Sequence, residues 1–340
     1  MCPPLVPTAQ ALFSQPKKGG YKLVSVLAAI RTYQVDLSFK FHVTEILATF
    51  LALLAYFIVM AHHGKNAQSP GSVGAHPASG SRQSGVRGLI RSFLAASSPK
   101  ERLLFLIGAS FLWLVEGWPL ADLANASIFA YLMQNLLLSL VAVPLMLMGT
   151  PRWVFSRLTK PRYLDWVLSK LTRSLVATSI FTLTMTSVML PDVVNSETGS
   201  ILVSSLVHLW VGLAAAIMWI PALRLLPGIR QLSTAGRIAY LFTQSLLPNI
   251  PAIALIFAKH SLYPTIAPYV RSLGISAVAD QQLAGGVGKI FSLLILWGAA
   301  VVILIRANRD EELGLDPELI TWDDVEREFE RTSKRVTPEA

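Results

Sequence analysis

The sequence predicts an all-α integral membrane protein, a bundle of seven transmembrane helices with the N-terminus outside and the C-terminus in the cytoplasm. Of its 340 residues, 53% are apolar and only 14% are charged, whereas a soluble domain carries about 25% charged residues. The mean hydropathy is +0.53. The apolar residues form long continuous runs, unlike the alternating strands of about ten residues that build membrane barrels. The net charge of +9 comes from basic residues between those runs, which indicates membrane orientation and not nucleic-acid binding.

Seven apolar runs approach the length of about 20 residues that a helix needs to cross a bilayer. The most informative is 128–149, which holds no charged residue. The second run is short and ends at Trp118, an aromatic residue typical of the membrane interface. The fourth ends at Pro191. The predicted spans are 42–61, 102–118, 128–149, 173–190, 201–222, 238–258 and 287–305.

The distribution of Lys and Arg predicts the orientation of the bundle, because positively charged loops stay in the cytoplasm. Four segments are rich in these residues and are predicted to be cytoplasmic: 62–102, 150–173, 223–237 and the tail from Arg306. They contain six, six, three and six Lys or Arg residues, in that order. Three segments are predicted to lie outside: 119–127, 191–200 and 259–286, with none, none and two. Only residues 1–41, with five, disagree with this orientation, and the other segments agree with one another.

Three further segments are predicted not to cross the membrane. Residues 1–41 form an N-terminal tail in which 21–33 has the pattern of an interfacial amphipathic helix. Residues 64–98 are rich in Gly, Ser and Ala and are predicted to form a flexible cytoplasmic loop. Residues 306–340 form an acidic cytoplasmic tail, where Trp322, Val325 and Phe329 share one side of a short helix.

Polar side chains within or beside the spans are predicted to converge near the outer face. Spacings of three and four place Tyr131, Gln134 and Asn135 on one face of the third span. The fifth span contributes His208, and the fourth ends near Met185 and Met189. The string from Asp280 through Gln281 to Gln282 precedes the seventh span at the same level. Polar groups inside a membrane are costly, so they normally face a partner helix or a cavity.

Each of these residues also has a structural interpretation. A single intramembrane histidine is more often a hydrogen-bonded packing residue than a ligand, and methionines more often fill the core. Asp280 is equally well explained as a cap of the seventh helix. Gly285, Gly286 and Gly288 allow close helix contact, while Pro144 and Pro251 kink their helices.

The sequence offers no catalytic constellation, and the prediction is that the protein is not an enzyme. There is no GxSxG, P-loop or HExxH motif. The only cysteine is Cys2, so no disulfide or thiolate cluster forms within the chain. We expect no paired carboxylates inside the membrane, and Lys289 as the only charge within a span.

Six motifs follow one another between Ser98 and Arg306. They are SPKERLLFLIG from Ser98, WPLADLA from Trp118, AYLMQNLLL from Ala130, PLMLMGTP from Pro144, His208 with the later WIP at Trp219, and DQQLAG from Asp280. Because these motifs occur in this order and on these spans, the chain resembles the seven-helix CtaG-type family of bacterial cytochrome c oxidase assembly factors, the caa-oxidase type. The last motif is the most specific of the six.

The resemblance implies a bacterial cytoplasmic membrane protein that matures cytochrome c oxidase by supporting copper delivery. Its partners would be oxidase subunits or a copper donor, within the lipid bilayer. The chain departs from the family where the third span presents histidines, since Tyr131 and Asn135 stand there. The fourth span, which typically ends W-H-x-P in the family, here ends at Met189, Leu190 and Pro191.

These departures leave two hypotheses within the family. Either Cu(I), which thioether sulfur suits, is bound by His208 and Met189 near Asp280, or metal binding is lost and the fold acts as a scaffold. Two hypotheses lie outside the family: a small-solute transporter that uses the outer polar cluster, and a structural subunit without a ligand. The missing internal repeat counts against the transporter.

Overall fold

The computed structural model describes residues 43–67, 93–226 and 232–313, and every regular element within them is helical. The predictions for 21–33, for most of the loop 64–98 and for the tail beyond 313 lie outside these residues. The elements are α2 (Val43–Ala67), α4 (Pro99–Glu116), α5 (Leu120–Ala124), α6 (Ile128–Leu137), the π-helical η2 (Leu138–Ala142), α7 (Val143–Met148), α8 (Arg152–Leu158), α9 (Arg162–Leu171), α10 (Ser174–Ser187), α11 (Pro191–Gly199), α12 (Ile201–Leu223), α13 (Thr234–Leu246), the 3-10 turn η3 (Leu247–Asn249), α14 (Ile250–Phe257), α15 (Ala267–Ser272) and α16 (Ala277–Glu312).

Four helical stretches of the described chain are long and apolar enough to cross a membrane. They are Ile128–Met148, Ile201–Leu223, Thr234–Phe257 and Ala277–Glu312. A fifth crossing is added if α10 and α11 count together, although they meet at a bend of 69°. The chain is therefore a multi-pass membrane protein with an all-helical fold, and the remaining predicted spans fall on α2 and α4, which do not meet the same test.

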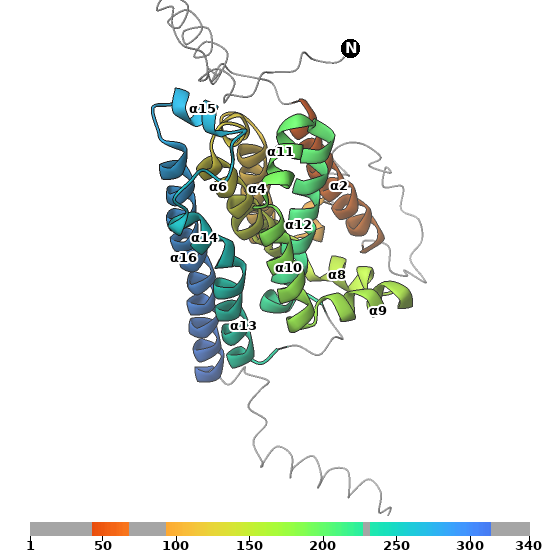
Figure 1. Cartoon of the computed structure of the whole chain (residues 1–340). Helices are drawn as coiled ribbons and strands as arrows, with labels where there is room; N and C mark the ends of the chain where they lie inside the picture. The colour runs from red at the N-terminus through yellow and green to blue at the C-terminus, as the bar shows by residue number, and fades with distance from the viewer. Residues whose placement is uncertain (1–42, 68–92, 227–231, 314–340) are drawn as a thin grey trace, which may run out of the picture.

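The helices form one bundle with two ends (Figure 1). At the end we call upper, as drawn in Figure 1, lie α11, α15 and the start of α6; α8 and α9 lie across the lower end. The last helix, α16, packs against α6, α13 and α14, while α4 packs against α7 and α10 against α12. The helix α2 packs on α4 at the opposite side of the bundle from α16 (Figure 1).

Serine side chains begin several of these helices, as expected for residues that satisfy the first free N–H groups. Ser98 and Glu101 form a reciprocal capping box at the start of α4. Ser127 caps α6, and Ser276 caps α16 by accepting a hydrogen bond from the amide of Ala279. The last cap shows that α16 begins ten residues before the predicted span at 287, so Asp280–Gln282 lie inside the helix and not before it.

Proline distorts two helices, as the sequence predicts. Pro144 has no N–H and cannot donate to the carbonyl four residues earlier. The chain widens into the π-helical turn η2 immediately before it, which lets the helix continue without that bond. The 3-10 turn η3 likewise precedes Pro251 and separates α13 from α14.

Glycines mark the closest helix contacts. A Cβ on Gly149 would lie 2.3 Å from the backbone nitrogen of Phe105, and one on Gly108 would lie 2.8 Å from that of Met146. These two glycines therefore allow α4 and α7 to cross almost backbone to backbone, the usual role of small residues between membrane helices. On α16, a Cβ at Gly285 would lie 2.6 Å from the carbonyl oxygen of Ala252.

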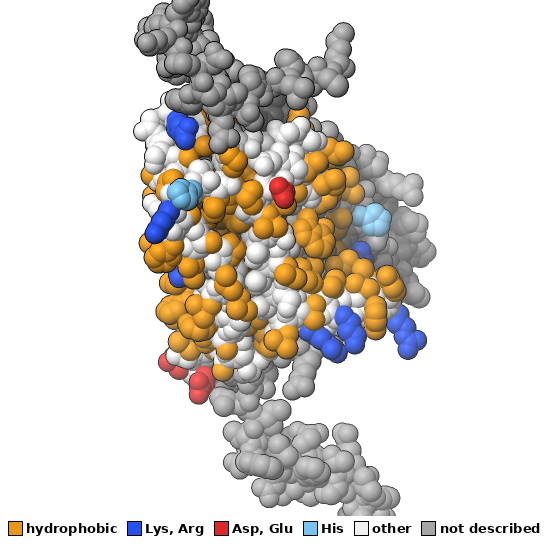
Figure 2. Space-filling view, in the orientation of Figure 1, with side chains coloured by type: hydrophobic (Ala, Val, Ile, Leu, Met, Phe, Trp, Pro, Cys, Tyr) orange, Lys and Arg blue, Asp and Glu red, His pale blue; other side chains and the backbone are white. Residues whose placement is uncertain are grey.

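Hydrophobic side chains cover most of the face shown in Figure 2. Lys and Arg side chains gather at its lower edge, beneath α8 and α9, and Asp and Glu lie at the lower end of α16 (Figure 2). Leucines and isoleucines project from the spans with half or more of their surface exposed, including Leu206, Leu209 and Ile290. A belt of this kind is what a lipid-facing surface requires.

Candidate functional site

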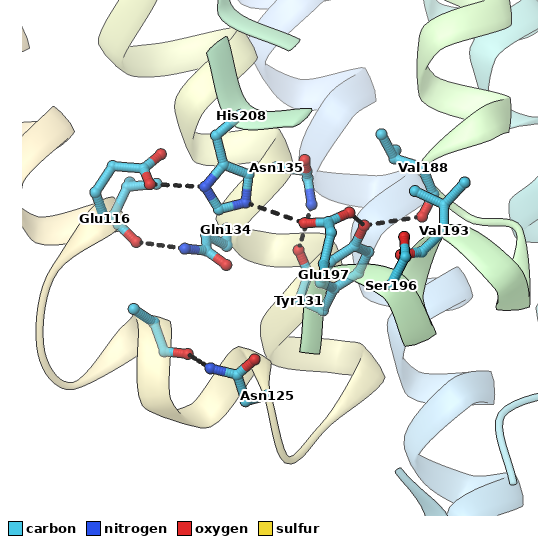
Figure 3. A network of polar contacts seen from close by, with 12 residues as sticks. Glu116, Asn125, Tyr131, Gln134, Asn135, Val188, Val193, Ser196, Glu197 and His208 are labelled. Atoms are coloured by element: carbon cyan, nitrogen blue, oxygen red, sulfur yellow. Dashed lines mark hydrogen bonds and ion pairs between the residues drawn. The ribbon is translucent and has the colours of Figure 1, made fainter. Parts of the chain in front are cut away.

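A buried polar network lies at the upper end of the bundle, where four helices meet (Figure 3). It contains Glu116 at the end of α4, Tyr131 on α6, Glu197 on α11 and His208 on α12. We call these four residues the central network. Its members come from positions far apart in the sequence, so the fold alone brings them together.

The imidazole of His208 lies between two carboxylates. Its Nδ1 is 2.7 Å from Oε2 of Glu116, and its Nε2 is 3.6 Å from Oε2 of Glu197. The side chains of the three residues are 11%, 16% and 5% exposed in that order. Because both ring nitrogens face carboxylate oxygen, the arrangement favours an imidazole that donates protons over one that offers a lone pair.

The hydroxyl of Tyr131 connects α6 to the α10–α11 bend. It lies 2.6 Å from Oε1 of Glu197 and 2.9 Å from the carbonyl oxygen of Val188. The first distance is in the range of an O–H group donating to a carboxylate. Tyr131 therefore holds Glu197 from the side opposite His208, and the carboxylate is fixed between two helices.

The other polar residues of the third span bind backbone groups nearby. The side chain of Gln134 donates to the carbonyl of Val115 at 2.9 Å, which satisfies one of the free carbonyls at the end of α4. Asn135 donates to the carbonyl of Tyr131 at 3.0 Å. Its Oδ1 is buried and has no hydrogen-bond partner among the described residues. The stripe predicted on one face of 128–149 therefore faces partner helices.

Asp280 caps a helix, but not its own. Its carboxylate accepts hydrogen bonds from Oγ of Ser127 at 2.6 Å and from the amide of Ile128 at 2.7 Å. These groups begin α6, so the carboxylate of α16 satisfies free N–H and O–H donors of the third span. Asp280 therefore acts as a helix cap, as predicted, but it caps α6 and not α16.

The two glutamines after Asp280 bind the connection that follows α14. Gln281 accepts from the amide of Leu262 at 3.0 Å and donates to the carbonyl of His260 at 2.8 Å. Gln282 donates to the carbonyl of Ala258 at 3.2 Å. The Asp-Gln-Gln string thus fastens the start of α16 to two neighbouring segments. The six residues predicted as one outer cluster divide into this set on α16 and the set on α6.

Met189 and His208 line different cavities. Met185 and Met189 line a cavity of about 40 Å³ between α6, α10, α14 and α16, together with Gln244. His208 borders a larger cavity of about 480 Å³, together with Glu116.

The carbonyl of Met189 accepts a hydrogen bond from Tyr263 at 2.7 Å. Burial raises the pKa of Tyr263 to about 12, so that phenol stays a neutral donor.

The donor set does not fit a Cu(I) ion, which prefers thiolate or thioether sulfur. The groups around His208 are carboxylates, and within the described residues no group of three or more His, Cys, Asp or Glu side chains is arranged to hold a metal ion. Cu(I) binding by His208 and Met189 stays a prediction that this geometry does not favour.

Sequence reasoning missed two of the four residues of the central network. The expectation that Lys289 is the only charge within a span is wrong, because Glu116 lies inside the predicted span 102–118. The expectation of no paired carboxylates inside the membrane stays a prediction, although Glu116 and Glu197 flank one imidazole. Glu197 lies in 191–200, which the sequence predicts as a connection between spans. In the structure this segment contains the helix α11.

The chain matches a protein-family model. The model described as cytochrome c oxidase caa3 assembly factor matches residues 84–310, well over half of the chain. No curated protein and no solved structure matches the chain. The family match covers the helices from α4 to α16 and includes all four residues of the central network.

Proposed function

The chain belongs to the cytochrome c oxidase caa3 assembly factor family, and from this premise we propose that it assists assembly of a haem–copper oxidase in a bacterial cytoplasmic membrane. It does so by contact with oxidase subunits or with a copper donor, and it catalyses no reaction itself. The family match carries this proposal. The helical bundle with its lipid-facing belt supports it, because the oxidase is itself a membrane complex.

The proposed topology has seven spans, with the N-terminus outside. Its seven crossings would be α2, α4, α6–α7, α10, α12, α13–α14 and α16, and the way these helices run along the bundle in Figure 1 supports this assignment. The basic residues of α8 and α9 lie at the lower end, which the positive-inside rule assigns to the cytoplasm. The central network then lies toward the outer face, where copper centres facing the outside of the cell would be reached.

We propose that the central network is a rigid structural element of this surface and not a metal carrier. The observation behind this proposal is the pair of carboxylates on His208, at 2.7 Å and 3.6 Å. A paired and hydrogen-bonded set of buried charges fixes the relative positions of the helices that carry it. Such a set would hold α4, α11 and α12 in one arrangement for a partner protein to recognise.

Gene deletion with complementation tests the proposal. The deletion strain should lose assembled oxidase, measured by its haem spectrum, its copper content and its activity in isolated membranes. The wild-type gene should restore all three. A deletion strain with normal oxidase would overturn the assembly role.

A second arm separates the scaffold from copper delivery. The variants Met189→Leu and Cys2→Ser remove sulfur and keep the central network. If the scaffold proposal is correct, each restores oxidase with full copper content. If Met189→Leu restores an oxidase that lacks copper, the chain delivers the metal and the scaffold proposal is wrong.

A further inference from the structure

The larger cavity beside His208 has the dimensions of a ligand site. It has a volume of about 480 Å³ and lies between α2, α4, η2, α7 and α12. Pockets that bind small organic molecules range from about 300 to 1,000 Å³. Most of its wall is apolar, with Leu112, Leu138, Met146 and Leu213 among the lining side chains.

The ionisable groups of this cavity lie at its upper end. Glu116 and His208 line that end, while Phe105 on α4 and Ala216 on α12 line the other. Glu116 and Phe105 are eleven residues apart on one helix, which corresponds to roughly 16 Å along the axis at 1.5 Å per residue. The cavity is therefore elongated along the bundle, lined mostly by apolar side chains, with its ionisable groups at one end.

Two buried polar atoms on its wall have no hydrogen-bond partner in the described part of the chain. They are Oγ1 of Thr49 and Oε1 of Glu116. Thr49 is 8% exposed. A buried polar atom without a partner costs about 1–3 kcal/mol, so such atoms call for an occupant. Because an ionised carboxylate only accepts, the occupant must offer Glu116 a donor.

The cavity opens at the middle of a membrane span. A Cβ built on Gly212 would meet no atom within 4 Å, and Gly212 lines the cavity halfway along α12. Its neighbours Leu209 and Leu213 are 60% and 50% exposed. Since α12 is long and apolar enough to cross the membrane, the opening meets hydrocarbon and not water. The occupant therefore comes from the bilayer.

We propose that this cavity binds the hydrocarbon chain of a membrane amphiphile whose head group, a hydroxyl or an ammonium, donates a hydrogen bond to Glu116 and also forms a hydrogen bond with Thr49. An anionic head group is disfavoured, because Glu116 and Glu197 share one imidazole. A plain hydrocarbon would leave both polar atoms unpartnered. The proposal does not rest on the role in oxidase assembly, because the site is defined by its own wall.

Photolabelling of the purified full-length protein in detergent tests the proposal. The probes are hexadecanol and hexadecylamine with a diazirine in the chain, and the matching hexadecane without a head group. The wild type should be labelled by at least one of the two headed probes on peptides of α4, α7 and α12, more strongly than by the hexadecane probe. Stronger labelling by the alcohol supports a hydroxyl ligand, and stronger labelling by the amine supports an ammonium ligand.

A filled cavity provides the decisive variant. Gly212→Leu places a side chain in the open space and should lower labelling by about tenfold, which equals about 1.4 kcal/mol of binding. Gly298→Leu is the matched control, because a Cβ at Gly298 also meets no atom within 4 Å but lies on α16, away from the cavity. Labelling of Gly298→Leu should equal that of the wild type.

Two results would overturn the proposal: equal labelling of wild type and Gly212→Leu, or labelling by the hexadecane probe as strong as by both headed probes. If Gly212→Leu fails to elute as a folded protein on size exclusion, Thr49→Val decides, because it keeps the side-chain shape. It should reduce labelling by the headed probe and leave hexadecane labelling unchanged. Unchanged labelling by all probes would contradict the proposal.

Discussion

His208 Nδ1 lies 2.7 Å from Oε2 of Glu116, so a short hydrogen bond joins α12 to the last residue of α4 inside the bundle. Removal of one member of a buried pair leaves an uncompensated charge and costs about 3–5 kcal/mol. We therefore expect His208→Leu to lower the free energy of unfolding by about this amount, measured by denaturation in detergent.

The double variant Glu116→Leu with His208→Leu is the informative comparison. His208→Leu leaves both Glu116 and Glu197 without the histidine, whereas the double variant leaves only Glu197, and replacing both members of a buried pair by apolar residues is often nearly neutral. We expect the double variant to be more stable than His208→Leu alone. A double variant that loses the sum of the two single effects would show that the residues do not interact.

Tyr131→Phe is expected to loosen α11. The phenol hydroxyl contacts Glu197 at 2.6 Å and Val188 at 2.9 Å, and its loss leaves two buried acceptors without this donor, at about 1–3 kcal/mol. Amide hydrogen exchange along α11 should accelerate. Tyr163→Phe serves as the control, because Tyr163 is 76% exposed and its hydroxyl should not matter.

Asp280→Asn is expected to destabilise the start of α6 and not the start of α16. The substitution removes the charge from two short hydrogen bonds, to Ser127 and to the amide of Ile128. Loss of a helix cap costs about 0.5–2 kcal/mol, and exchange of the Ile128 amide should accelerate. Asp192→Asn, at an exposed carboxylate in the first turn of α11, should change stability by much less.

Gly149→Ala is expected to be poorly tolerated, because the added Cβ would lie 2.3 Å from the backbone of Phe105. Backbone cannot rotate away as a side chain can, so α4 and α7 must separate. Overpacking of this kind costs about 1–3 kcal/mol. Gly286→Ala is the control, since its Cβ would meet no atom within 4 Å. Equal melting temperatures for the two variants would contradict the close crossing.

The long spans could be predicted from the sequence because burial in lipid leaves a continuous local pattern. The runs predicted at 128–149 and 201–222 agree with the structure within one residue at each end. The start of α16 could not be found in this way. Its first turns carry Asp280–Gln282, whose partners lie about 20 to 150 residues away, so the polar string looked like a loop.

The site was predicted in part for the same reason. Tyr131 and His208 stand out as polar residues within apolar runs. Glu197 does not stand out, because α11 is a short polar helix whose burial depends on the 69° bend after α10. Whether two ionisable residues face each other depends on packing between helices. The local sequence pattern around each residue does not predict that packing.

Copper binding separates the two hypotheses that the sequence left open. In the structure His208 faces carboxylates, and Met189 lines another cavity. We therefore expect the purified protein to compete no better for Cu(I) against a chromophoric chelator than His208→Ala or Met189→Leu does. All three should carry Cys2→Ser, because that lone thiol could bind Cu(I) on its own. The scaffold proposal would be wrong if the Cys2→Ser protein bound one equivalent of Cu(I) and both His208→Ala and Met189→Leu abolished that binding. This result would require the two side chains to meet in a rearranged bundle.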